Sequence, residues 1–175
     1  MIKNDIVNAL KSNHETFLNM VANLPQERLL QSIDRKWSPA AQVKHIILSV
    51  RPLRKALQLP KFLLRLFFGK SNREGKSYEN LVKRYREKLN AGGKAPASFV
   101  PAVTEPVSLE SMRLELLDEI QKVCSLLDRF SEQEMDLYIL PHPLLGKLTL
   151  REMMYFTMYH VTHHGQSITD QFQLK

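Results

Sequence analysis

Cysteine is nearly absent from this chain, whose 175 residues include one, Cys124. A single cysteine excludes an internal disulfide framework and a cysteine-rich metal site, and it suits a reducing compartment, so we expect a cytoplasmic protein. Long apolar runs are also lacking, and without a stretch of about 18 apolar residues we expect no membrane span. Residues 1–17 are amphipathic and lack the apolar centre of a signal peptide.

Glycine-rich phosphate-binding motifs are missing as well. The sequence contains no P-loop and no G-x-G-x-x-G motif, so a nucleotide cofactor is not supported. Acidic residues are scarce in one segment, because residues 51–94 contain 13 Lys and Arg but only 3 Asp and Glu, in a chain of net charge +7. The remainder is net negative, so we expect no sequence-specific nucleic-acid binding. The alternative that this basic segment binds nucleic acid or a membrane remains open.

Helical periodicity is the dominant pattern in the sequence. Apolar residues recur at helical spacing in four segments, near 2–24, 39–51, 108–130 and 149–171. Pro52 is expected to bend or end the second of them. We see no alternating strand pattern, and the length fits one domain, residues 1–175. The sequence therefore predicts an all-α protein, a four-helix bundle.

A long basic insert, residues 52–107, separates the second and third predicted core helices. We expect a helix at 77–90, then an irregular connection to about 107 that forms a lid, a strap or a mobile loop. The apolar and basic stretch at 61–70 is expected to pack over the mouth of the bundle with its Lys and Arg in water; the alternative is a membrane surface. Ser131 begins a capping box that predicts a short helix before the 141–146 loop.

Three of the six histidines occupy inward helical positions. His160 and His164 are four residues apart on one helix face, and His45 lies on the apolar face of the second helix. Two imidazoles so placed can reach one metal ion, and a bundle brings inward side chains of different helices together. The zincin motif is excluded because Val161 follows His160 where that motif needs Glu. The alternative is that these histidines are buried and hydrogen-bonded within the core.

The remaining histidines, Trp37 and Cys124 are predicted to have surface, structural or pocket-lining positions. We expect His14 at the surface, His142 in a structural loop position, Trp37 as a packing anchor and Cys124 as a buried core residue. His163 points away from His160, towards a pocket rim or a dimer face. Side chains that would line a pocket beside the metal are Tyr155, Tyr159, His163 and Gln166.

Two segments together resemble the DinB/YfiT-like superfamily. They are WSPAAQVKHI at 37–46 and HPLLGKLTLREMMYFTMYHVTHHGQSI at 142–168. The departures are Ala40 and Ala41 ahead of Gln42, where the family often has an acidic or amide residue close to the proline, and the basic insert. The resemblance implies a divalent metal bound by His45, His160 and His164. We expect Zn²⁺ or Ni²⁺, because imidazole ligands favour these ions over Mn²⁺, and three histidines would leave open coordination positions.

The family also implies a range of functions. Some members transfer low-molecular-weight thiols, and others are regarded as metal-dependent hydrolases. We therefore expect a metal-dependent enzyme with a small-molecule substrate. We also expect the protein to form a homodimer. The alternative is a non-catalytic stress-response module that binds a ligand or partner, with a structural metal or none. A second carboxylate or histidine near the metal would favour hydrolysis. A deep pocket with basic walls would favour an acidic thiol as co-substrate.

Overall fold

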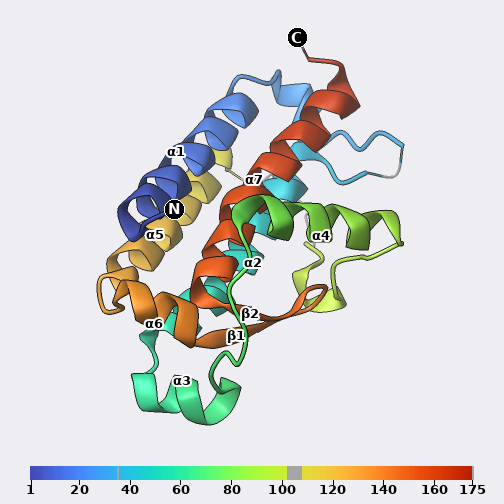
Figure 1. Cartoon of the computed structure of the whole chain (residues 1–175). Helices are drawn as coiled ribbons and strands as arrows, with labels where there is room; N and C mark the ends of the chain where they lie inside the picture. The colour runs from blue at the N-terminus through green and yellow to red at the C-terminus, as the bar shows by residue number, and fades with distance from the viewer. Residues whose placement is uncertain (35, 102–107, 175) are drawn as a thin grey trace.

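Four long helices form the body of the molecule (Figure 1). The computed structural model describes residues 1–34, 36–101 and 108–174. The long helices are α1 (Lys3–Ala22), α2 (Pro39–Gln58), α5 (Leu109–Leu127) and α7 (Leu150–Phe172). Helix α2 packs along α5, and α1 packs along both α7 and α5. The predicted four-helix bundle is therefore confirmed.

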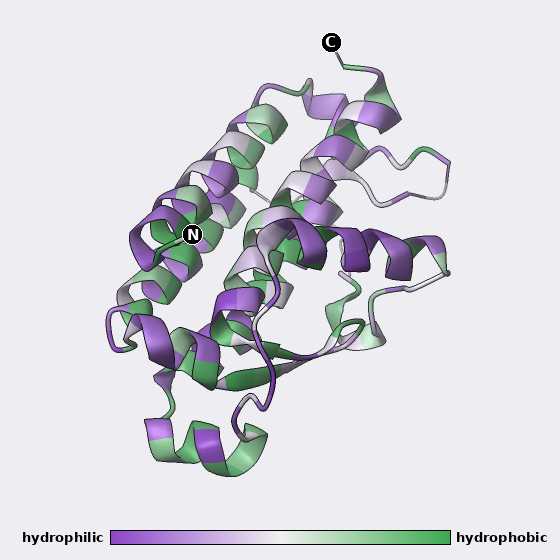
Figure 2. Ribbon diagram, in the orientation of Figure 1, coloured by the Kyte–Doolittle hydropathy of each residue, from purple (hydrophilic) through white to green (hydrophobic). Residues whose placement is uncertain are grey.

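The helix starts follow local sequence signals. The Ser38 hydroxyl accepts a hydrogen bond from the Ala41 N–H, and Pro39 occupies the first turn of α2. Thr149 and Glu152 form a capping box at the start of α7. The buried faces of the long helices form one apolar core. In Figure 2 hydrophobic residues appear as green segments of the helix ribbons. No helix in the described ranges is both long and apolar enough to cross a membrane.

Helix α2 runs further than the sequence predicts. It continues through Pro52 and ends at Gln58. A proline in a helix removes one backbone hydrogen bond, but Leu53 and Leu57 just beyond it are buried. Packing of these leucines in the core therefore keeps the last turns helical. The first part of the 52–107 segment consequently extends a core helix.

A short hairpin is the element that sequence periodicity did not indicate. Strand β1 (Ile139–His142) pairs antiparallel with β2 (Gly146–Thr149), directly after α6 (Glu132–Leu137). Gly146 has φ +76°, a conformation that favours glycine in the turn. The strands are four residues long and do not alternate in burial, with the pattern buried, buried, exposed, intermediate in β1. Such short strands escape a search for alternating patterns.

Two further helices lie between α2 and α5. Helix α3 (Lys61–Phe68) projects at one end of the molecule, and α4 (Tyr78–Asn90) packs across α7 (Figure 1). Single-turn 3-10 helices are η1 (Gln26–Arg28) and η2 (Ala97–Phe99), the latter against α2. The predicted lid or strap includes residues 102–107, which lie outside the described residues. The described part that contains η2 contributes to the site.

Candidate metal centre

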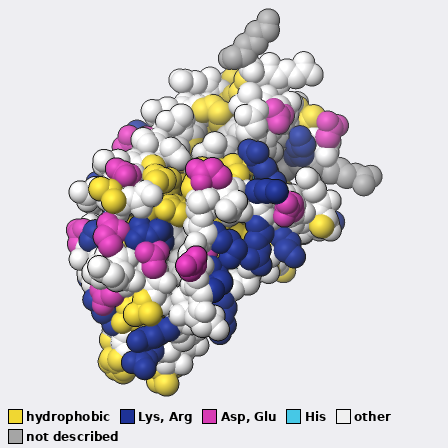
Figure 3. All heavy atoms as spheres, viewed as in Figure 1, with side chains coloured by type: hydrophobic (Ala, Val, Ile, Leu, Met, Phe, Trp, Pro, Cys, Tyr) yellow, Lys and Arg dark blue, Asp and Glu magenta, His cyan; other side chains and the backbone are white. Residues whose placement is uncertain are grey.

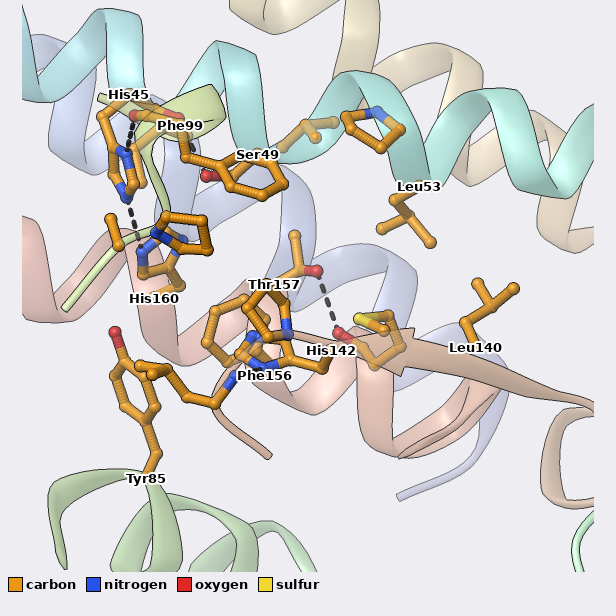
Figure 4. A pocket seen from close by; sticks show the side chains of 18 of the residues that line it. His45, Ser49, Leu53, Tyr85, Phe99, Leu140, His142, Phe156, Thr157 and His160 are labelled. Carbon is orange, nitrogen blue, oxygen red and sulfur yellow. Dashed lines mark hydrogen bonds between the residues drawn. The ribbon is translucent and has the colours of Figure 1, made fainter. Parts of the chain in front are cut away.

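Three histidine side chains from two helices converge inside the bundle. His45 comes from α2, and His160 and His164 come from successive turns of α7. The Nε2 atom of His160 lies 3.2 Å from Nε2 of His45 and 3.2 Å from Nε2 of His164. One ring nitrogen from each of the three lies within 4.8 Å of the others, and all three residues are buried. Figure 4 shows His45 and His160 facing each other across the cavity.

The hydrogen bonds on the outer side of two rings fix which nitrogen carries the proton. His45 Nδ1 lies 2.7 Å from the backbone oxygen of Phe99, and His164 Nδ1 lies 2.8 Å from Oε1 of Gln42. Both oxygens can only accept, so each Nδ1 is the donor and each Nε2 presents a lone pair. His160 Nε2 has one proton at most and can satisfy only one of these two lone pairs. The cluster therefore contains more acceptors than its own protons can satisfy.

This arrangement has the dimensions of a metal site. Zinc bound tetrahedrally to imidazoles at about 2.05 Å holds the nitrogens about 3.3 Å apart. The two 3.2 Å separations match that spacing. Metal-bound histidines commonly donate their other N–H to a carbonyl or carboxylate, as His45 and His164 do here to a carbonyl and an amide oxygen. The residues present therefore fit a divalent cation.

Burial keeps the three rings neutral. Burial lowers the pKa of His160 well below its ordinary value, and the neighbouring His164 and His45 lower it further. The pKa of His164 is lowered in the same way by burial and then by His45. Burial also lowers the pKa of His45, although its bond to the Phe99 carbonyl opposes the shift. Neutral imidazole is the form that binds a metal, so the site does not need to lose protons at neutral pH.

The cluster opens onto a cavity of about 370 Å³. Its walls are mainly apolar, with Leu53 from α2, Phe99 from η2, Leu140 from β1 and Phe156 from α7 among them (Figure 4). None of the described residues that line it is Lys, Arg, Asp or Glu. The polar side chains of the wall are Ser49, Tyr85, Thr157 and the histidines His14, His45, His142, His160, His163 and His164.

His14 is not at the surface, contrary to the sequence prediction. Its side chain is fully buried and lines the cavity. Nδ1 donates to the Leu10 carbonyl at 2.7 Å, which leaves Nε2 as an acceptor with no hydrogen-bond partner among the described residues. Burial lowers its pKa to about 4. His14 lies on the same buried face of α1 as Leu10 and Phe17. The prediction was wrong because only the apolar residues were assigned to that face, and the histidine between them was not.

His142 has the structural role predicted for it and also lines the cavity. Its Nδ1 accepts hydrogen bonds from the N–H groups of Leu144 and Leu145, at 3.2 and 3.1 Å. Because Nδ1 accepts, the proton of the neutral ring is on Nε2, which is a donor. Burial lowers the pKa of His142 to about 4, so the ring is neutral at physiological pH. The cavity wall thus contains His142 with its donor fixed at Nε2, and His14, whose acceptor Nε2 is enclosed in the wall.

The predicted pocket residues fall in different places. His163 lines the cavity and also a second, more polar hollow of about 490 Å³, where Tyr159 and Gln166 lie. The Tyr159 hydroxyl accepts a hydrogen bond from Arg86 at 2.7 Å. Tyr155 is not among the described residues that line either hollow; it is buried and its ring packs edge-on against Tyr78.

Three residues of the site were not singled out from the sequence. Gln42 is buried one turn before His45 and bridges two elements, because its amide also donates to the Trp37 carbonyl at 3.0 Å. Phe99 holds the His45 ring through its backbone oxygen, a contact that no sequence pattern reveals. Tyr85 extends from α4 towards the cluster, with its ring 6.3 Å from that of His160 (Figure 4). For Gln42 a signal existed, its position three residues before His45 on the same helix face.

Trp37 and Cys124 are both packed residues. The Trp37 ring lies 4.8 Å from the His45 ring and 6.4 Å from that of His164, so this packing anchor braces two members of the cluster. Cys124 is a buried core residue of α5, as predicted. Burial raises the pKa of its thiol to about 11, which leaves the sulfur protonated and unreactive.

Comparisons with known proteins agree with this architecture. The family model of the DinB superfamily matches residues 9–168. No curated protein matches the sequence. A solved structure that resembles the chain is YfiT from Bacillus subtilis, described as a probable metal-dependent hydrolase with an unusual four-helix bundle topology. The two share 16% identity with a TM-score of 0.64, over 98% of this chain and 86% of YfiT. Because the family model spans most of the sequence, the chain belongs to the DinB superfamily.

Proposed function

We propose that this protein is a divalent-metal-dependent hydrolase of small, largely apolar substrates, with the metal bound by His45, His160 and His164. The observation that carries the proposal is that Nε2 of His160 lies 3.2 Å from Nε2 of His45 and 3.2 Å from Nε2 of His164, while oxygen acceptors hold the rings of His45 and His164 from behind. YfiT, which shares the fold, is described as a probable metal-dependent hydrolase. Zn²⁺ and Ni²⁺ are the ions we expect, since both bind imidazole strongly.

His45, His160 and His164 would hold the divalent cation, which would supply Lewis acidity and activate a water molecule for hydrolysis. The chain's own residues supply the rest of the site. The His142 Nε2–H would donate a hydrogen bond to an oxygen atom of the substrate. Tyr85, whose pKa is raised by burial, keeps its proton and is a second donor. The apolar walls exclude bulk water and bind the apolar part of the substrate.

The cavity favours hydrolysis over thiol transfer. An acidic thiol would need cationic walls, and no Lys or Arg is found among the described residues that line the cavity. Additional histidines that line the same cavity, His14, His142 and His163, favour a hydrolytic site. Thiol transfer is therefore our second candidate reaction, after hydrolysis.

The test is metal titration followed by an activity assay. We expect the purified, metal-stripped chain to bind about one equivalent of Zn²⁺ or Ni²⁺. His164→Gln removes one ligand and should weaken binding at least about 100-fold. His163→Gln, the adjacent residue in the sequence, is the matched control and should bind metal as the parent chain does.

Activity is measured on a panel of esters with acyl groups of increasing length. Metal-loaded protein should hydrolyse them, and both metal-stripped protein and His164→Gln should not. Equal and negligible metal in the parent and His164→Gln would overturn the metal site. Tight metal binding with no hydrolysis and a large fall in melting temperature on chelation would instead indicate a structural metal.

A further inference from the structure

Helix α3 has apolar side chains on two sides, and the fold uses only one of them. Leu64 is fully buried against the body, and Phe68 lines the cavity. On the other side Phe62, Leu66 and Phe67 are 68%, 71% and 62% exposed, which makes them the most exposed large apolar side chains in the described part of the chain. Exposed apolar clusters of this kind mark sites of interaction.

The helix is firmly attached to the rest of the molecule. Lys61 Nζ lies 2.7 Å from the carboxylate of Glu134 on α6, and this ion pair holds the start of the helix. Just after its end, the Ser71 N–H donates to the Leu137 carbonyl at 2.8 Å, and Lys70 forms a backbone bridge with Tyr138. The exposed side chains are therefore held on a fixed support and not on a loose loop.

Positive charge surrounds the exposed apolar side chains. Residues 61–70 contain no Asp or Glu. Arg65 and Lys70 are exposed, and Lys147 approaches the end of the helix, with its Nζ 3.5 Å from the Phe68 carbonyl. Figure 3 shows hydrophobic and basic side chains side by side at this end of the molecule. A short helix with aromatic and leucine side chains on its outer face and basic residues beside them is typical of attachment to a membrane interface.

The charge pattern argues against a second copy of the chain as the occupant. A symmetric dimer through α3 would place Arg65, Lys70 and Lys147 of both copies against each other without acidic partners from this helix, and like charges at a contact are unfavourable. An anionic lipid surface satisfies both features at once, because phosphate and carboxylate headgroups pair with the basic residues while the acyl boundary takes the apolar side chains.

We propose that α3 attaches this protein to the surface of anionic phospholipid membranes. Phe62, Leu66 and Phe67 enter the boundary between headgroups and acyl chains, and Arg65, Lys70 and Lys147 contact the headgroups. The attachment is peripheral, since the helix is eight residues long and lies along the surface. It does not depend on the hydrolase activity proposed above.

The test is co-sedimentation with vesicles of phosphatidylcholine alone and of phosphatidylcholine mixed with phosphatidylserine. We expect binding to the mixed vesicles that falls with added salt, and much weaker binding to phosphatidylcholine. The double variant Phe62→Ser/Phe67→Ser should lose at least about tenfold in partitioning, because two phenyl groups no longer enter the interface. Arg65→Glu should weaken binding to the anionic vesicles specifically.

The matched control is Leu114→Ser on α5, where a leucine is 58% exposed away from α3. It should bind vesicles as the parent chain does, and circular dichroism should show all variants folded. The proposal is overturned if the parent chain does not sediment with anionic vesicles, or if the double variant binds them equally well. It is also overturned if sedimentation velocity shows a dimer that the double variant abolishes, or if α3 variants reduce binding to single-stranded RNA and not to vesicles.

Discussion

The start and the middle of α7 bury polar groups in opposite ways. At its start, the Glu152 carboxylate is almost completely buried and fully supplied with donors. Further along the same helix, His160 and His164 are buried beside His45 with a surplus of acceptors. Buried polar groups cost stability unless they are satisfied, so the difference is informative. The first cluster is complete within the chain, whereas the second is left with a nitrogen lone pair that the proposed cation would satisfy.

The Glu152 cluster connects three segments. Its two carboxylate oxygens each lie 2.6 Å from an Arg73 guanidinium nitrogen, and the N–H groups of Lys76 and Thr149 donate to them at 2.8 and 3.0 Å. Burial alone would raise the pKa of Glu152, but these donors outweigh it and the pKa is lowered. This cluster holds the connection between α3 and α4 against the start of α7. Its role is structural.

Acidification should distinguish the buried histidines around the cavity from the Glu152 cluster most strongly. Burial lowers the pKa of His14 and of His142 from 6.5 to about 4 in the folded state. The unfolded chain therefore takes up more protons below pH 6.5, and stability falls as the pH drops from 6.5 towards 4. For His14 alone the loss reaches about 3 kcal/mol near pH 4. The Glu152 carboxyl, with a lowered pKa, loses its contribution only below its ordinary value of 4.5.

The measurement is urea unfolding of metal-free protein at intervals between pH 7 and pH 4. The free energy of unfolding should fall steadily below pH 6.5. In His14→Met, which removes one of the buried imidazoles, the fall should be shallower. Added Zn²⁺ should move to lower pH only the part of the fall that comes from the three-histidine cluster, because metal and protons compete for the same nitrogens there. A free energy of unfolding that does not change between pH 7 and pH 4 would contradict the prediction that the buried histidines destabilise the protein in acid.

Glu152→Gln should damage stability without affecting the metal site. The substitution leaves Arg73 and Lys76 without their carboxylate, and we expect a loss of about 2–3 kcal/mol, moderated because Arg73 is partly exposed. The readouts are the melting temperature and the affinity for Zn²⁺. The exposed pair of Asp118 and Lys122 provides the control, since Asp118→Asn should cost less than about 0.5 kcal/mol. A large fall in Zn²⁺ affinity in Glu152→Gln would show that the Glu152 cluster and the three-histidine cluster are coupled.

Gln42→Leu should weaken metal binding and leave the Glu152 cluster unchanged. The leucine removes the oxygen that accepts from His164 Nδ1, so the ring loses its orientation, and we expect metal affinity to fall by about 10- to 100-fold. Zn²⁺ titration of the metal-stripped protein measures the change. Gln166→Leu, on the exposed face of α7, is the control and should bind Zn²⁺ normally. An unchanged affinity in Gln42→Leu would mean that the Gln42 contact does not orient the ligand.

Much of the fold could be predicted from the sequence because local rules act strongly in long helices. The apolar spacing in α1, α5 and α7, and the caps at Ser38, Ser108 and Thr149, depend on residues within one or two turns of each other. The same periodicity placed His45, His160 and His164 on inward faces. The β1–β2 hairpin was missed because its strands are too short to show a period, and α2 passes Pro52 because distant packing outweighs a local break.

What the sequence alone determined is which faces of the helices are buried and which histidines lie on them. Only the tertiary structure decided which buried groups meet. It brought His14 into the cavity, set the Phe99 carbonyl and the Gln42 amide behind two rings, and left one side of α3 in water. The physical reason is range: periodicity and capping depend on neighbours along the chain. The partners of a buried polar atom depend on helix packing between residues as much as 122 positions apart, the separation of His164 and Gln42.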